Sequence, residues 1–125
     1  MDSTIKVIQV ILALFAGAAG SLRLFTPYAR FIRLPAQGWA HEFEPWQVKF
    51  IGILELAAGI GIIASLFLQS LTMVTALAAV GIALVMAGAM ATHFRRAEYP
   101  NMIGNLVWLG LALFFAYSTL VGGVV

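Results

Sequence analysis

Apolar residues fall into four long runs along this chain, and most polar residues lie between them. The runs cover approximately residues 5–25, 48–68, 71–92 and 102–124. Each run is long enough for a helix to cross the roughly 30 Å hydrocarbon layer of a bilayer. None shows the short alternating segments of a membrane barrel. The pattern therefore predicts an all-α fold, in which residues 1–125 form one domain, a compact four-helix transmembrane bundle.

The two later connections between the runs are short. Only Gln69 and Ser70 separate the second and third runs, so these helices should form an antiparallel hairpin. Residues 94–101 join the third run to the fourth. In that linker Pro100 ends the connection, and Asn101 is placed to cap the fourth helix.

The first connection is long and contains a helical pattern of its own. Residues 26–34 predict a short helix at the membrane interface, with Thr26 as its cap and its aromatic and basic residues on opposite faces. An irregular loop is the alternative. Trp39 and Trp46 are expected to anchor this segment at the level of the lipid headgroups.

Basic residues mark one end of the expected bundle. Lys6 alone lies near the other end, whereas the first and third connections hold or adjoin Arg23, Arg30, Arg33, Lys49, Arg95 and Arg96. By the positive-inside rule these two connections face the cytoplasm, and both termini lie outside. We therefore expect an integral protein of a bacterial plasma membrane, with the lipid bilayer as its first partner.

Composition agrees with a membrane protein and argues against other classes. Apolar residues make up 62% of the chain and charged residues 10%, and the mean hydropathy is +1.00. A net charge of +2 is too small to indicate nucleic acid as a partner. Without cysteine there is no disulfide or thiol chemistry, and with two histidines, of which His41 lies outside the expected spans, no metal site is predicted.

The second run carries a carboxylate, Glu55, inside the expected span. An acidic side chain at the centre of a bilayer costs roughly 2.5–3.5 kcal/mol on insertion scales, so it normally faces the bundle interior or a polar cavity. Gly52 and Gly59 lie three residues before and four residues after it, on the same helical face. Such a face is expected to pack on other helices. The same is expected of the small residues spaced four apart elsewhere in the chain: Ala13 and Gly17, Ala57 and Gly61, Ala83, Ala87 and Ala91, and Ala112 and Ala116. Glu55 is either a packing carboxylate beside a basic neighbour or a functional group.

Polar residues from all four helices are predicted to meet in the cytoplasmic half of the membrane. Arg23 ends the first helix, Glu55 lies about 10 Å into the second, and His93 ends the third. Asn105 and Trp108 share one stripe of the fourth helix. We take Glu55 and His93 as candidate catalytic residues, and Arg23, Asn105 and Trp108 as candidate ligand-binding residues. Each also has a structural alternative: headgroup contact for Arg23, an interfacial position for His93, interhelical hydrogen bonding for Asn105 and packing for Trp108.

Three stretches of the chain resemble the DoxX-like membrane proteins: GSLRL at residues 20–24, FIGILELAAG at 50–59 and MAGAMATHFRRAE at 86–98. The resemblance covers nearly the whole chain and implies the same four-helix layout. Arg23 stands where the family often has lysine, which keeps the charge. The family is named after a subunit of a thiosulfate:quinone oxidoreductase, and its relatives include membrane subunits of redox complexes and chaperone-like membrane proteins. It therefore implies the fold more strongly than the activity.

Three functions remain open at this point. In the first, the bundle binds a lipophilic small molecule such as a quinone and serves as the membrane subunit of an oxidoreductase complex, with a quinone as the one cofactor to consider. In the second, it is a cofactor-free membrane enzyme of the isomerase or cyclase type, in which Glu55 and His93 act as acid and base. In the third, it is a membrane scaffold or chaperone, and Glu55 forms a structural pair with Arg23.

Overall fold

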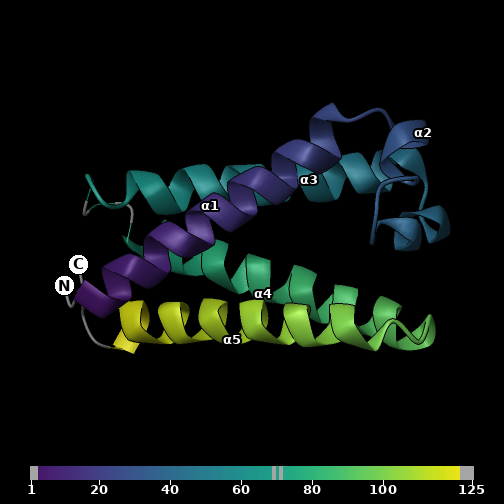
Figure 1. Cartoon of the computed structure of the whole chain (residues 1–125). Coiled ribbons are helices and arrows are strands. Elements are labelled where there is room, and N and C mark those ends of the chain that lie inside the picture. The colour runs from purple at the N-terminus through teal and green to yellow at the C-terminus, as the bar shows by residue number, and fades with distance from the viewer. Residues whose placement is uncertain (1–2, 69, 71, 122–125) are drawn as a thin grey trace.

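Four long helices dominate the computed structural model, which describes residues 3–68, 70 and 72–121 (Figure 1). The elements are α1 (Ser3–Phe25), α2 (Tyr28–Phe31), the 3-10 helix η1 (Gly38–Glu42), α3 (Pro45–Ala64), α4 (Thr72–Arg95) and α5 (Tyr99–Val121). The described residues form no strand, and the four long helices are each long and apolar enough to cross a membrane. The predicted all-α bundle is confirmed.

The helices associate as two antiparallel pairs, α1 with α3 and α4 with α5 (Figure 1). Glycines bring the backbones of the first pair into contact. A Cβ atom added to Gly20 would lie 2.5 Å from the backbone nitrogen of Leu56, and one added to Gly59 would lie 2.9 Å from the backbone oxygen of Ala13. Gly52, Glu55 and Gly59 are all buried on this side of α3. The helical face predicted around Glu55 is thus a packed face, as expected.

Not every row of small residues packs against a helix. Ala13 on α1 and the pair Ala112 and Ala116 on α5 are buried, in line with the prediction. Ala57 is exposed, however, and a Cβ atom added to Gly61 would meet nothing within 4 Å. For Ala57 and Gly61 the prediction is wrong, because they border a space between α3 and α4 that neither helix fills. It is also wrong for Ala87 and Ala91 on α4, which are exposed.

Two clusters of buried apolar residues lie at different levels of the bundle. The central core joins all four long helices and includes Leu12, Ile62, Met86 and Phe115. The loop cluster consists of Phe31, Trp39, Ala40 and Val48. Between these levels the two helix pairs diverge toward α2 and η1 (Figure 1). We call this end, formed by α2, η1 and the turn at residues 96–98, the basic end of the bundle.

The first connection differs from its prediction in detail. The helix is shorter than residues 26–34, since α2 covers only Tyr28–Phe31 and Pro27, not Thr26, occupies its N-cap position. The backbone oxygen of Thr26 instead accepts a hydrogen bond from the Lys49 ammonium group. The predicted two faces are present: Phe31 is buried, and the arginines of the segment are exposed.

The two tryptophans of this connection have different positions. Trp46 is 65% exposed, as expected of a headgroup anchor. Trp39 is only 9% exposed and packs edge-on against Phe31 and Phe43. Its assignment as a surface anchor is therefore wrong, because η1 folds its ring inward onto the ends of the helices.

Local capping explains why α3 begins earlier than the predicted residue 48. α3 starts at Pro45 because Glu44 and Gln47 form a capping box around it.

The short link predicted after α3, at Gln69 and Ser70, lies partly outside the described residues, and α3 already ends at Ala64.

The turn from α4 to α5 is a Schellman motif. Ala97 has a left-handed backbone with φ of 57°, its N–H bonds to the oxygen of Phe94, and the N–H of Glu98 bonds to the oxygen of His93. α5 therefore begins at Tyr99, and Asn101 lies within its first turn, where its N–H donates to the oxygen of Glu98. The prediction that Asn101 caps this helix is wrong.

Candidate functional site

Glu55 forms a buried ion pair across the first helix pair. The close contact of α1 and α3 places Arg23, at the end of α1, opposite Glu55, which is 1% exposed. The Nη1 atom of Arg23 donates a hydrogen bond to Oε1 of Glu55. Two residues that are 32 positions apart are thus brought together by the glycine contacts, and the charge of the carboxylate is compensated inside the bundle.

Trp39 completes the surroundings of Arg23. The guanidinium carbon of Arg23 lies 5.4 Å from the centroid of the Trp39 ring, a distance at which a cation is attracted to the ring face. The sequence did not predict this contact. Trp39 lies in the first connection, where no helical periodicity indicates which side chains face the end of α1. Trp39 is therefore a site residue that only the folded first connection reveals.

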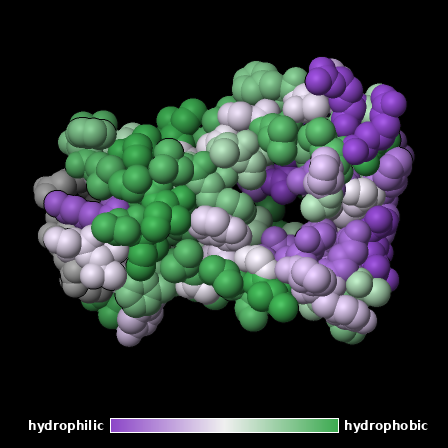
Figure 2. Space-filling model, viewed as in Figure 1, coloured by the Kyte–Doolittle hydropathy of each residue, from purple (hydrophilic) through white to green (hydrophobic). Residues whose placement is uncertain are grey.

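A cavity of about 380 Å³, which we call the polar cavity, opens between the helix pairs toward the basic end. It is lined by residues from all four long helices and from η1, among them Arg23, Trp39, Thr92, His93 and Asn105. Figure 2 shows a hollow in this region with hydrophilic residues around it. The structure thus brings three of the five predicted site residues, Arg23, His93 and Asn105, to one cavity.

Two of the lining residues carry hydrogen-bond donors with no acceptor. Nε of Arg23 and Nδ2 of Asn105 are buried, and neither has a hydrogen-bond partner among the described residues. Arg23 belongs to the first helix pair and Asn105 to the second, so the two side chains line the cavity from opposite sides. An unsatisfied buried donor costs about 1–3 kcal/mol.

His93 is oriented by a carboxylate from the turn that follows α4. Its Nδ1 atom lies 2.8 Å from Oε1 of Glu98, and Nε of Arg96 donates to the same oxygen at 3.1 Å. The hydrogen bond with His93, helped by Arg96, holds the pKa of Glu98 below its usual range. The carboxylate partner of His93 is therefore Glu98 and not Glu55, a pairing that depends on the left-handed residue Ala97 between them.

Trp108 lies apart from the polar cavity. Its ring stacks on the ring of Phe15 from α1, with centroids 3.9 Å apart and an interplanar angle of 12°. Both rings pack against the central core. The structure thus places Trp108 at a partly buried position beside the core, where it packs α5 against α1.

Ion pairs between η1 and the end of α4 lie at the basic end, beside the polar cavity. Oε1 and Oε2 of Glu42, in η1, lie 2.8 Å from Arg95 and 3.2 Å from Arg96, respectively. The hydrogen bonds from Arg96 and then Arg95 hold the pKa of Glu42 below its usual range. These contacts connect the first connection to the end of α4 where the helix pairs have diverged. Among residues 3–68, 70 and 72–121 no three histidine or carboxylate side chains group as a metal site.

Comparison with known proteins identifies the family of this fold. The family model described as DoxX-like matches residues 7–115, a range that includes part of every long helix and all the site residues named above. No curated protein and no solved structure matches the chain. The resemblance noted in the sequence is thereby confirmed.

Proposed function

We propose a ligand-binding role for this chain, which belongs to the DoxX-like family and is an integral membrane protein. Functions within the family differ, and the observation that supports this role is the polar cavity. The proposed ligand is a lipophilic, quinone-like molecule, bound by a chain that serves as the membrane subunit of an oxidoreductase complex. On the positive-inside rule we place the basic end at the cytoplasmic face of a bacterial plasma membrane, with both termini outside.

The two unpaired donors of the polar cavity carry this proposal. Arg23 Nε and Asn105 Nδ2 are buried N–H groups on opposite sides of a space whose other lining is mostly apolar. A quinone has two carbonyl acceptors on opposite edges of a flat apolar ring. We expect each carbonyl to accept a hydrogen bond from one of these N–H groups, which would remove the cost of leaving them unsatisfied.

The size and walls of the cavity support a ligand of this kind. A volume of about 380 Å³ falls within the range of roughly 300–1,000 Å³ that is typical of small-molecule sites. Trp39 and Phe43 contribute aromatic rings to the wall. His93, held through Nδ1 by Glu98, adds a polar side chain to the same wall.

The alternatives predict different contacts. An acid–base pair of Glu55 and His93 is less well supported, because Glu55 is bonded to Arg23 and His93 to Glu98. The scaffold hypothesis expects the Glu55–Arg23 ion pair, which the structure contains. The experiment must therefore separate ligand binding from a purely structural role.

Replacing Asn105 with leucine provides this test, since it removes the amide and keeps a similar side-chain volume. The matched control is Asn101→Leu, one turn away on α5 and outside the lining of the polar cavity. Binding of a short-chain benzoquinone to the purified protein would be followed by quenching of tryptophan fluorescence. Loss of one hydrogen bond, about 0.5–1.5 kcal/mol, should weaken binding roughly two- to thirteenfold in Asn105→Leu and leave the control unchanged. Equal affinities for both variants, or no binding to the wild type, would instead favour the scaffold.

A further inference from the structure

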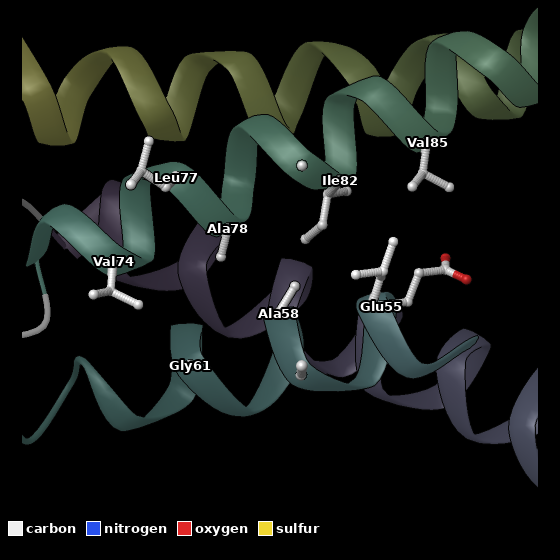
Figure 3. Close-up of a pocket in the computed structure, with 11 residues that line it drawn as sticks. Glu55, Ala58, Gly61, Val74, Leu77, Ala78, Ile82 and Val85 are labelled. Carbon is white, nitrogen blue, oxygen red and sulfur yellow. The ribbon is translucent and has the colours of Figure 1, made fainter. Parts of the chain in front are cut away.

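A second cavity, which we call the α3–α4 groove, lies between the two helix pairs on the side of α3 and α4 (Figure 3). Its volume is about 400 Å³. The groove exists because small residues, Ala58 and Gly61 on α3 and Ala78 and Gly81 on α4, stand where larger side chains would fill the gap. A Cβ atom added to Gly61 or Gly81 would meet nothing within 4 Å, so open space lies beside both.

Glu55 supplies the one charged group of this groove. Figure 3 shows its carboxylate at one end of the groove, extending from α3 toward Val85 on α4. Oε1 accepts the hydrogen bond from Arg23, whereas Oε2 is buried and has no hydrogen-bond partner among the described residues. Glu55 is 1% exposed, so water does not reach its unpaired oxygen. Because a buried acceptor without a hydrogen bond is destabilising, a further donor at Oε2 would stabilise the carboxylate.

The chemistry of the missing donor follows from the charges already present. Arg23 compensates the charge of Glu55, and the remaining lining of the groove is apolar, so a second cation would be buried without a partner of its own. A neutral hydroxyl group can donate to Oε2 without adding charge. The rest of the ligand must be apolar to match leucine, valine, isoleucine and alanine side chains.

The groove is open to the lipid-facing surface of the bundle. Large apolar residues at its rim are exposed: Leu54 is 46%, Val74 54% and Leu77 61% exposed. In a bilayer these side chains contact acyl chains, so a molecule dissolved in the membrane reaches the groove from the side. We infer that the α3–α4 groove binds a hydroxyl-bearing lipophile, whose hydroxyl donates to Oε2 of Glu55.

This site differs in selectivity from the polar cavity and does not rest on the function proposed there. The polar cavity presents unpaired donors and suits a carbonyl compound, whereas the groove presents an unpaired acceptor and suits an alcohol or phenol. The Arg23–Glu55 ion pair lies between the two. Val85 borders both spaces.

Photolabelling of the full chain in phosphatidylcholine nanodiscs tests the inference. The probe is a diazirine-bearing dodecyl alcohol, and its matched control is the methyl ether of the same probe, which cannot donate a hydrogen bond. We expect the alcohol to label residues 54–61 and 74–85 and to bind roughly tenfold more tightly than the ether, the change expected for a hydrogen bond to a charged acceptor. Equal labelling by alcohol and ether would overturn the inference.

Filling the groove gives an independent test that leaves Glu55 in place. Gly81→Leu should abolish labelling, because its Cβ atom would meet nothing within 4 Å and the rest of the leucine side chain would occupy the groove from α4. Gly104→Leu is the control, since Gly104 on α5 is equally unobstructed and lies outside the groove. Labelling that persists in Gly81→Leu would refute the site.

Two competitors identify the source of the hydroxyl. Displacement of the probe by diacylglycerol in the nanodisc assigns the groove to a membrane lipid. Displacement by dodecanol alone assigns it to a smaller diffusing alcohol, and either result supports the site. Failure of both competitors would overturn it.

Discussion

Replacing Gly20 with alanine should separate α1 from α3 where their backbones touch. The new Cβ atom would lie 2.5 Å from the backbone nitrogen of Leu56 and 2.7 Å from the backbone oxygen of Gly52. Ordinary contacts between such atoms are about 3.5 Å, so the helices would have to move apart by roughly 1 Å. Because both neighbours are backbone atoms, no side-chain rotation can relieve the contact.

The cost can be measured against an internal reference on the same helix. Gly17→Ala is the matched control, since a Cβ atom added there meets nothing within 4 Å. Both substitutions gain about 0.8–1 kcal/mol of helix propensity, and this gain cancels in their comparison. Only Gly20→Ala adds an overpacking cost of about 1–3 kcal/mol. We therefore expect it to be about 1–3 kcal/mol less stable than Gly17→Ala.

Unfolding in mixed micelles measures this difference. Sodium dodecyl sulfate is titrated into mild detergent, and unfolding is followed by tryptophan fluorescence. Free energies of unfolding for Gly17→Ala and Gly20→Ala that agree within about 0.5 kcal/mol, below the smallest overpacking cost, would refute the close glycine contact. Disruption of the Arg23–Glu55 ion pair in Gly20→Ala should accompany the loss of stability, because the pair spans the same two helices.

Two further predictions concern the basic end. Ala97→Gly should raise the free energy of unfolding by about 1 kcal/mol, because glycine adopts the left-handed backbone at φ of 57° without the steric cost that alanine bears; a destabilised variant in the same micelle assay would contradict this account of the turn. Glu42 has a pKa below its ordinary value of 4.5, so its ion pairs are fully formed above pH 4.5 and are lost as the pH falls through the lower folded pKa. Amide exchange in η1, corrected for the intrinsic effect of pH, should therefore accelerate on acidification, and Glu42→Gln should exchange fast at every pH; a wild type without this transition would refute the role of the ion pairs.

Much of the fold could be predicted because helices encode their packing locally. The length of each apolar run defines a span, and the spacing of Gly52, Glu55 and Gly59 puts all three on one face whatever surrounds the helix. Helix direction likewise placed Arg23, His93 and Asn105 at one level, and the structure finds them around one cavity.

Other features of the site depended on short segments whose geometry has no period. η1 carries Trp39 over Arg23, although the sequence suggested a membrane anchor. The left-handed turn at Ala97 brings Glu98 to His93, so Glu55 and His93 do not form the expected pair. Neither contact can be predicted from helix length or amphipathicity. Both depend on the backbone angles of short non-periodic segments, which set the direction in which the chain continues.

The order of residues alone is enough to predict a four-helix membrane protein with an acidic and a basic side chain in one half of the bundle. Which side chains share a cavity depends on how the helices pack. Glycine contacts hold α1 against α3 at backbone distance, while bulkier core residues such as Met86 and Phe115 separate the helix pairs, which then diverge. The spaces on either side of Glu55 and Arg23 result from that divergence, and the angle between packed helices is set by all their contacts together and not by any single run of residues.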